Sequence, residues 1–423
     1  MLDEQIRNAF LAILREELIP AMGCTEPIAL AYAAARAREF LPGEPVRMKT
    51  ACSGNMIKNV RSVQIPHSGG MHGIEAAVIL GAVGGDAGLG MEVLSPVTQD
   101  AIEKTRRMRE ANACKVEYLD SEIPLHFTVE VSDGENTVFT EVKYEHLNIV
   151  KIVRNGDVLK DMDMAGEEET TADRSLLSME RIKAFADEVD LGLVRDLIER
   201  QIRYNMDIAY EGISGNYGLG IGRVLRSSYP DSDVTRMKAY AAAASEARMD
   251  GCDMPVIINS GSGNQGIASS VPVIIYAREH DIPQEKLYRA LLFSALLTIY
   301  QKEFIGKLSA FCGAVSASCA SGAAVTYLCG GTLDQIKATV GNTLANIPGI
   351  ICDGAKVSCA AKIASSLDAA MMAHYLSMNG QEYQAYTGIL KEEIGETISC
   401  VGQIAKDGMK QTDQEIVKLM LEK

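Results

Sequence analysis

Basic residues are scarce in this chain of 423 residues. Its 41 Lys and Arg are outnumbered by 56 Asp and Glu, which leaves a formal net charge of −15. Such a charge argues against nucleic acid or an anionic membrane as a partner. The N-terminus also lacks the apolar core of a signal peptide, because charged residues run through 1–19 at the spacing of an amphipathic helix. We therefore expect a cytoplasmic protein.

The ten cysteines include no C-x₂-C pair, so a zinc knuckle with closely paired ligands is not expected. Disulfides are not expected in a reducing compartment either. Several of the cysteines should then be ordinary buried thiols. We expect this of Cys114, Cys252, Cys329 and Cys400.

Charged residues are absent from 308–333, a run long enough to cross a bilayer. Its residues are mainly Ala, Ser, Gly and Cys, which drive membrane insertion only weakly. Small residues also let helices approach closely. The run therefore predicts a deeply buried helix and its turn, with no membrane as partner.

The hydrophobic pattern predicts an α+β protein with two domains. Residues 1–173 should form a mixed domain, with a helix over 4–19, a strand over 46–52 and an antiparallel β-meander over about 115–160. Asp133-Gly134 and Asn155-Gly156 are two-residue hairpin signals within that meander. The acidic stretch 162–173 reads as a linker or exposed loop.

Residues 174–423 should form an all-α domain, because the apolar period there is helical almost throughout. The expected helices cover 175–187, 191–210, 234–249, 284–300, 333–346 and a final segment from Thr412 to Leu421, with Thr412 as its N-cap. No internal repeat or low-complexity tract is evident.

Three cysteines in this second domain carry most of the functional information. Cys312 and Cys352 are forty residues apart, and Cys359 follows seven residues later. Asp353-Gly354 lies between the last two, so a tight turn could bring both sulfurs to one point. Three converging thiolates suggest a metal centre with one open position. Cys319 could be a fourth ligand, and buried structural thiols remain an alternative on spacing alone.

Cys24 precedes a second, Ala-rich helix for which Thr25 is the expected N-cap. Backbone N–H groups and the helix dipole favour a thiolate at such a position. Cys24 is therefore a candidate base or nucleophile, although a small residue packed at a turn would look the same. The six histidines supply no sequence context typical of a Cys–His hydrolase.

The segment 51–59 reads as a strand, a tight turn and a helix. Ser53 and Asn55, with the backbone amides from Gly54 onward, would form a small anion site suited to a carboxylate. Lys58 would add positive charge. An ordinary capped helix start is the competing interpretation.

His67 and His72 flank a Gly-rich loop over 68–71. Histidines in such loops reach ligands, although they are as often turn or surface residues. We include both as substrate-binding candidates.

The stretch 261–266 has the letters G-x-G-x-x-G. We reject a dinucleotide site, because Pro272 should interrupt the following helix and no βαβ units surround the motif. A Gly-rich loop for a small anion fits better, with Ser262, Asn264 and Gln265 as its polar side chains.

Together these motifs resemble the L-cysteine desulfidase family, which is related to the α-chain of the iron–sulfur L-serine dehydratases. The resemblance covers essentially the whole chain. It rests on residues 23–27, 52–59 and 259–266 and on the spacing of the three cysteines. The segment from Cys352 to Cys359 also resembles the Cys-Asp-Pro…Cys element of the serine dehydratases but is shorter, which favours the desulfidase side.

The resemblance implies a 4Fe-4S cluster held by Cys312, Cys352 and Cys359, without Cys319, and a catalytic role for Cys24. It implies a lyase that converts L-cysteine to pyruvate, ammonia and sulfide, with an open iron as Lewis acid, Cys24 as base and no pyridoxal phosphate. L-Serine or another β-substituted amino acid is the alternative substrate. A non-catalytic iron–sulfur sensor and a structural helical scaffold are more distant alternatives. The extent of small-residue helix surface suggests a homodimer.

Overall fold

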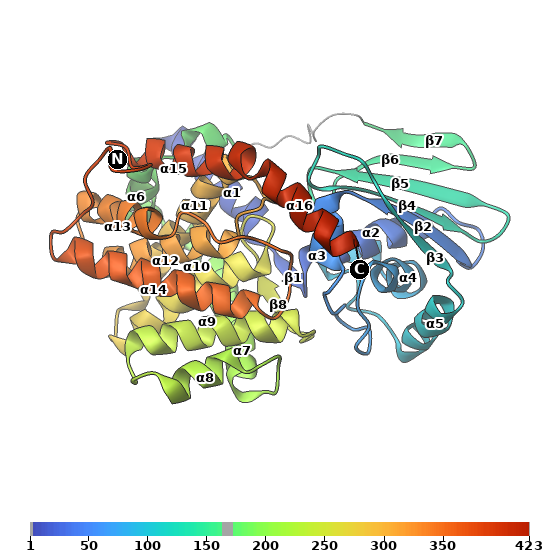
Figure 1. Cartoon of the computed structure of the whole chain (residues 1–423), viewed down its shortest axis with the longest axis horizontal. Helices are drawn as coiled ribbons and strands as arrows, with labels where there is room; N and C mark the ends of the chain where they lie inside the picture. The colour runs from blue at the N-terminus through green and yellow to red at the C-terminus, as the bar shows by residue number, and fades with distance from the viewer. Residues whose placement is uncertain (1–2, 163–171, 423) are drawn as a thin grey trace.

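A six-stranded sheet on one side and a cluster of helices on the other make up the mixed α/β fold (Figure 1). The computed structural model describes residues 3–162 and 172–422. The sheet has the order β3-β2-β4-β5-β6-β7. Its strands are β2 (Arg47–Cys52), β3 (Cys114–Tyr118), β4 (His126–Ser132), β5 (Thr137–Lys143), β6 (Ile149–Arg154) and β7 (Asp157–Asp161).

Strands β4 to β7 form the expected antiparallel meander. Asn155 and Gly156 make the predicted two-residue turn, with φ of 51° and 92°, as a type I′ hairpin requires. The turn at Asp133-Gly134 is wider than expected, because four residues separate the two strands. The Asp133 carboxylate accepts hydrogen bonds from the backbone N–H groups of Glu135 and Asn136 and closes this longer loop.

Two strands depart from the predicted layout. β3 continues the sheet as a parallel neighbour of β2 and not as a strand of the meander, so the sheet is mixed. The second half of the chain is not all-α either, because β8 (Pro255–Ile257) pairs antiparallel with β1 (Pro20–Met22). This short pair places the start of the second helix against the helical side.

Helices α2 (Thr25–Arg38) and α4 (Ile74–Gly84) cover one face of the sheet. They touch closely, because a Cβ at Gly81 would lie 2.3 Å from the Ala31 carbonyl oxygen. Alternate side chains of β4 and β5, such as Phe127, Val129 and Val142, are fully buried beneath them. Two further helices, α3 (Gly54–Val60) and α5 (Gln99–Glu110), complete this side.

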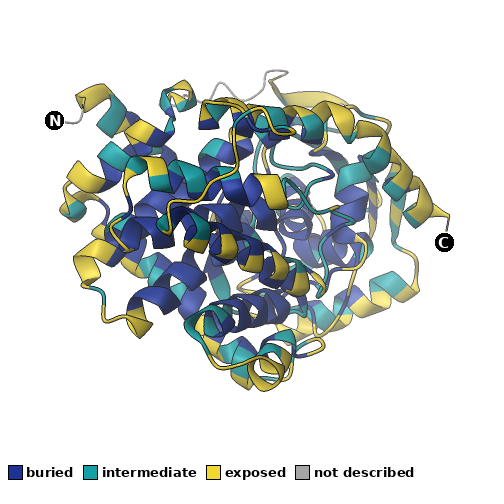
Figure 2. Cartoon of the chain, turned by 60° about the vertical axis from the view of Figure 1, so that its left-hand side comes forward, coloured by how far each residue is buried: buried dark blue, intermediate teal, exposed yellow. Residues whose placement is uncertain are grey.

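The helical side is built around α12 (Gly313–Leu328), in which every residue after Gly313 is buried, as the uncharged run predicted. Its neighbours are α10 (Gly263–Glu279), α11 (Gln284–Ile305), α13 (Leu333–Asn346) and α14 (Cys359–Met378). Gly322 lets α12 approach α14, since a Cβ there would lie 2.8 Å from that of Ala370. Figure 2 shows the buried residues gathered in the interior of the molecule and the exposed ones around its rim.

The remaining helices are α1 (Glu4–Glu17), α6 (Met179–Glu188), α7 (Arg195–Ser214), α8 (Ile221–Ser228), α9 (Asp233–Met249), α15 (Ile394–Gln403) and α16 (Lys410–Leu421). Several begin at residues other than those expected. Short 3₁₀ turns precede α6 and α7, and Met409, not Thr412, is the N-cap of α16. Cys24, not Thr25, is the N-cap of α2.

Pro272 lies inside α10 and does not interrupt it, contrary to the prediction. A proline within a helix removes one N–H donor and crowds the preceding turn. The Ser294 hydroxyl of α11 donates to the Ser269 carbonyl of that turn at 2.6 Å. Burial between neighbouring helices holds the rest of α10 in place.

The two ends of the described chain each reach the opposite half. α1 lies against α6 and α11, and α16 lies against α3. A domain boundary at 173/174 remains a prediction, and most of the linker predicted over 162–173 falls outside the described residues.

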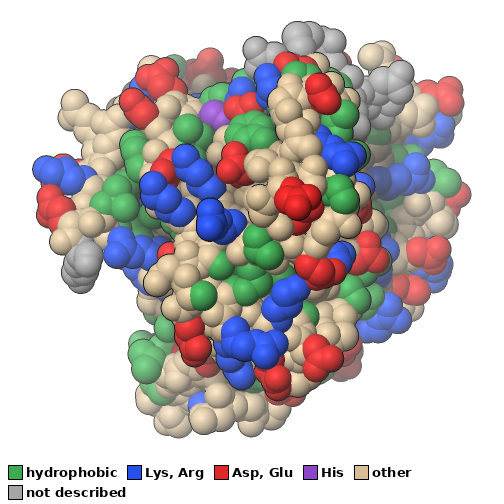
Figure 3. Space-filling view, turned by 90° about the vertical axis from the view of Figure 1, so that its right-hand side faces the viewer, with side chains coloured by type: hydrophobic (Ala, Val, Ile, Leu, Met, Phe, Trp, Pro, Cys, Tyr) green, Lys and Arg blue, Asp and Glu red, His purple; other side chains and the backbone are tan. Residues whose placement is uncertain are grey.

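No helix in residues 3–162 and 172–422 has the length and apolarity needed to cross a membrane. The face in Figure 3 carries basic and acidic side chains side by side.

Candidate functional site lined by four cysteines

Four of the ten cysteines line one small cavity of about 80 Å³. Cys24 is the N-cap of α2, Cys312 is the N-cap of α12, and Cys359 is the first residue of α14. Cys352 comes from the loop before α14. Three helix N-termini and one loop thus bring sulfur atoms from distant parts of the chain to the same place.

A short backbone bridge holds Cys312 beside Cys352. Phe311 and Ile351 pair antiparallel. The Cys312 N–H donates to the Ile350 carbonyl at 2.8 Å, and the Cys352 N–H donates to the Ala310 carbonyl at 2.7 Å. These bonds fix the two cysteines side by side, although the spacing between them in the sequence predicts no such pairing.

The two thiols of this pair differ in acidity. A hydrogen bond from the Cys312 thiol lowers the pKa of Cys352 to about 5, with further help from the positive charges of Lys58 and Lys362. The same hydrogen bond raises the pKa of Cys312. Cys352 is therefore the member of the pair that carries a thiolate at neutral pH, the form that binds metals.

The loop around Cys352 lies directly on α3. Gly354 has a φ of +98°, and a Cβ there would lie 2.1 Å from the Lys58 carbonyl oxygen, so glycine is required at this position. The buried Lys58 ammonium pairs with Asp413 of α16 at 2.5 Å. Asp353 accepts from Lys356 and, at 2.7 Å, from Lys362. Lys58 and Lys362 thus surround the Cys352 sulfur with positive charge.

Cys24 differs from the expectation of an activated thiolate. Burial raises its pKa to about 12, and the nearby charge of Arg248 only partly opposes this. The thiol points to Met249, with 3.8 Å between the two sulfur atoms. Desolvation therefore outweighs the helix N-terminus, and Cys24 is protonated at neutral pH.

Oppositely charged groups line the same cavity. Arg248 of α9 is 1% exposed, its Nε has no hydrogen-bond partner among the described residues, and its Nη1 donates to the Asn264 amide oxygen at 3.2 Å. Glu26 is 8% exposed, and burial raises its pKa. The Gln265 amide oxygen is likewise buried without a partner in the described part of the chain. Unpartnered buried donors and acceptors of this kind indicate room for a polar ligand.

The sequence-predicted site residues separate into two groups. Those lining the cavity are Cys24, Ser262, Asn264, Gln265, Cys312, Cys352 and Cys359. Those not among its lining residues are Ser53, Gly54, Asn55, Lys58, His67 and His72. Cys319 also lies elsewhere, fully buried inside α12.

The second group has other surroundings. The Ser53 hydroxyl donates to the Pro124 carbonyl at 2.6 Å. The His67 backbone N–H donates to Asp253 at 2.7 Å, and His72 is exposed. Lys58 does not line the cavity, but its positive charge lowers the pKa of Cys352, which does. Of the four thiols expected to be buried, Cys252 is buried, Cys114 and Cys400 are half-buried, and Cys329 is exposed.

Three charged or polar residues of the cavity, Glu26, Arg248 and His146, were not predicted to act there. Glu26 looked like an ordinary first-turn acid. Arg248 ends the Ala-rich helix α9, whose residues are buried almost all round. A lone Arg in such an Ala-rich stretch is a usable signal, because a buried guanidinium needs a partner. His146 stands in a loop with no motif around it.

No group of three or more His, Cys, Asp or Glu side chains within residues 3–162 and 172–422 is arranged to hold a metal ion. The donors around the cavity nevertheless fit an iron–sulfur cluster in chemistry, because such clusters take cysteine thiolates. Each cysteine of a cubane cluster binds a different iron, so its ligands lie farther apart than those of a single ion. Cys312, Cys352 and Cys359 all line the cavity and match that donor set.

Comparison with known proteins adds a family to this geometry. The family described as "Serine dehydratase alpha chain" matches residues 89–418. A "UPF0597 protein" of Lachnoclostridium phytofermentans is 48% identical over 409 residues, which cover 97% of this chain and 98% of the relative. One of Finegoldia magna is 45% identical over 98% of this chain and 99% of its own. A third relative, from Phocaeicola vulgatus, is 35% identical over 100% of this chain and 99% of its own length.

Proposed function

Since the chain belongs to the serine dehydratase alpha-chain family, which makes it a lyase of the dehydratase type, we propose that it eliminates the β-substituent of L-cysteine. The products are pyruvate, ammonia and sulfide. The observation that carries the proposal is the single cavity lined by Cys24, Cys312, Cys352 and Cys359. The cavity also contains charges of both signs.

In this proposal Cys312, Cys352 and Cys359 hold a 4Fe-4S cluster, and Cys319 takes no part. The low pKa of Cys352 supplies one ligand already in its thiolate form. When bound, the cluster supplies a Lewis acid that improves the leaving group at the β-carbon.

The charged residues of the cavity suit an amino-acid zwitterion. Arg248 is the anchor for the α-carboxylate, because a guanidinium binds a carboxylate through two parallel hydrogen bonds. Asn264 orients the guanidinium through its amide oxygen. Glu26 accepts the α-ammonium group. Together they fix Cα and turn the β-substituent toward the three cysteines.

Cys24 is the proposed base. Its thiolate takes the proton from Cα, the Cα–H electron pair forms the Cα=Cβ bond, and the Cβ–S bond breaks with release of hydrosulfide. The resulting aminoacrylate tautomerises to an imine, which water hydrolyses to pyruvate and ammonia. Arg248 is the group that most favours the thiolate form of Cys24.

L-Serine is the second candidate substrate, because the matched family carries its name. The two substrates differ by one atom, and none of the cavity residues distinguishes a thiol from a hydroxyl. Anaerobically reconstituted protein should be assayed with each amino acid for pyruvate, with sulfide measured beside it. The proposal predicts a higher kcat/KM for L-cysteine, with one sulfide for each pyruvate. A higher value for L-serine would move the assignment to the dehydratase.

A non-catalytic iron–sulfur sensor is the remaining alternative. It would not need the zwitterion-binding pair of Arg248 and Glu26. Absence of pyruvate from every β-substituted amino acid, in protein that carries its cluster, would favour it.

A further inference from the structure

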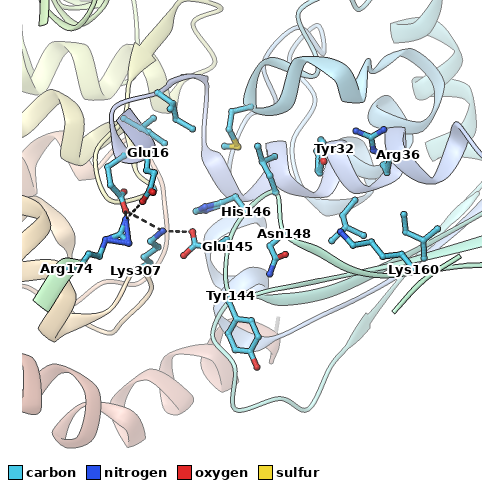
Figure 4. Close-up of a pocket in the computed structure, with 18 of the residues that line it drawn as sticks. Glu16, Tyr32, Arg36, Tyr144, Glu145, His146, Asn148, Lys160, Arg174 and Lys307 are labelled. Atoms are coloured by element: carbon cyan, nitrogen blue, oxygen red, sulfur yellow. Dashed lines mark hydrogen bonds and ion pairs between the residues drawn. The ribbon is translucent and has the colours of Figure 1, made fainter. Parts of the chain in front are cut away.

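A second, larger cavity opens beside the cysteine-lined one. It measures about 790 Å³ and lies between the end of α1, helix α2 and the loop that joins β5 to β6 (Figure 4). Its walls include Tyr32 and Arg36 of α2 and Tyr144 of that loop. We call it the outer cavity, and the cysteine-lined one the inner cavity.

Three residues line both cavities, namely His146, Gly261 and Lys307. They come from the β5–β6 loop, the turn before α10 and the segment after α11. Figure 4 shows His146 and Lys307 side by side on the wall of the outer cavity. We refer to these three residues as the doorway.

His146 is a buried residue of the doorway. It is 7% exposed, and its Nε2 has no hydrogen-bond partner among the described residues. A Cβ at Gly261 would lie 3.0 Å from the His146 Cε1, and Gly261 has a φ of +74°. Any side chain at 261 would therefore press on the imidazole ring.

The charges at the doorway are paired. Lys307 binds Glu145 and lies 3.7 Å from Glu17, and Arg174 binds Glu17. Arg174 also lies 3.3 Å from Glu16 and from Glu303, so the rim carries charges of both signs, as a zwitterion does. The unpartnered Nε2 of His146 offers a passing polar group one hydrogen bond.

We propose that the amino-acid substrate enters the inner cavity from the outer cavity through this doorway, and that His146 limits entry to small side chains. That the entering molecule is an amino acid rests on the proposed function. The path itself does not, because it is defined by the three residues that line both cavities.

The path is tested by thiol labelling of the iron-free full chain, which requires no turnover. Iodoacetamide and a bulky fluorescein maleimide are allowed to react in parallel, and mass spectrometry follows Cys352. His146→Ala should increase the rate at which the bulky reagent labels Cys352 severalfold and change the rate with the small reagent little. Gly261→Val should decrease both labelling rates. The exposed Cys329 serves as an internal standard whose labelling stays constant.

His72→Ala is the matched control, because His72 is exposed and lines neither cavity. Thermal unfolding of each variant identifies a folding defect, and a Gly261→Val variant that fails to fold leaves His146→Ala to decide. Equal labelling of Cys352 in wild type and His146→Ala by both reagents would overturn the doorway. That result would leave the proposed lyase reaction untouched, just as absence of turnover would leave the labelling result standing.

Discussion

Cys312 lies beside Cys352, although the two residues are far apart in the sequence, and their interaction lowers the pKa of Cys352 and raises that of Cys312. The arrangement depends on the backbone bridge between Phe311 and Ile351. In the proposed function it places two of the cluster's ligands side by side before any metal arrives. Cys352 would bind as a thiolate, and Cys312 would lose its proton on binding, so the proposal includes a release of protons when the cluster is inserted.

The first prediction concerns this difference in acidity. In iron-free protein at pH 6 to 7, iodoacetamide should alkylate Cys352 faster than Cys312, because only the thiolate reacts. Lys362→Met should slow the reaction of Cys352, since Lys362 lowers its pKa. Lys356→Met is the matched control, because Lys356 also binds Asp353 but is not among the groups that lower the pKa of Cys352. Equal rates at the two cysteines would contradict the assignment.

The second prediction concerns the carboxylate anchor. Arg248→Gln should weaken substrate binding by about 2 kcal/mol or more, which is roughly a 30-fold rise in KM. Arg236→Gln is the control on the same helix, because Arg236 pairs with Asp231 and Glu279 away from the cavity. Cysteamine, which lacks the carboxylate, should inhibit wild type and Arg248→Gln equally. An unchanged KM for Arg248→Gln would remove Arg248 from the binding site.

The third prediction concerns Cys24. Cys24→Ala should keep its iron but lose about 10²–10⁴-fold in kcat, the usual contribution of a general base. Because the pKa of Cys24 is raised to about 12, the thiolate fraction increases with pH, and kcat/KM should increase from pH 7 to 9. Cys52→Ala is the control, since Cys52 is equally buried but lies outside the cavity. A pH-independent rate or an active Cys24→Ala would contradict the role of Cys24 as base.

The fourth prediction concerns stability at alkaline pH. Burial raises the pKa values of Cys52 and Cys319 to about 12, whereas an unfolded thiol titrates near 8.5. Above that pH the unfolded chain loses protons that the folded chain keeps. The free energy of unfolding should therefore fall with increasing pH, by about 1.4 kcal/mol per pH unit for each thiol.

Urea unfolding of iron-free protein at pH 7, 9 and 10 measures this effect. The double variant Cys52→Ala/Cys319→Ala should show a smaller loss of stability between pH 9 and 10 than wild type. Cys329→Ala, which changes an exposed thiol, should match wild type. The same slope in all three proteins would show that the buried thiols do not titrate as described.

Local patterns in the sequence predicted much of the site. The cysteines were recognised because they stand in segments of small residues, where packing does not require them. Asn155-Gly156 was recognised because this dipeptide favours a two-residue hairpin turn. The failures at the site involve tertiary contacts. Ser53 looked free to bind an anion, but its hydroxyl is used by the Pro124 carbonyl. Cys24 looked activated because a helix dipole is visible in a sequence, whereas the burial that raises its pKa is not.

Arg248 was missed for the same reason. A charged residue near the end of a helix normally lies on the surface. The Ala-rich stretch before Arg248 indicates burial, but it does not show that α10 and α2 enclose the residue. Gly263 offers a retrospective explanation, since a Cβ there would lie 2.2 Å from the Arg248 Nε. The glycines of 261–266 thus make room for a buried guanidinium and a histidine ring, not for a dinucleotide.

The most direct test of the account is the iron and acid-labile sulfide content of anaerobically reconstituted protein, measured for wild type and Cys352→Ala together. The account predicts four iron and four sulfide per wild-type chain, the stoichiometry of a 4Fe-4S cluster, and loss of both in the variant. A Cys352→Ala protein that keeps the full complement, or a wild-type protein that takes up none, would contradict it.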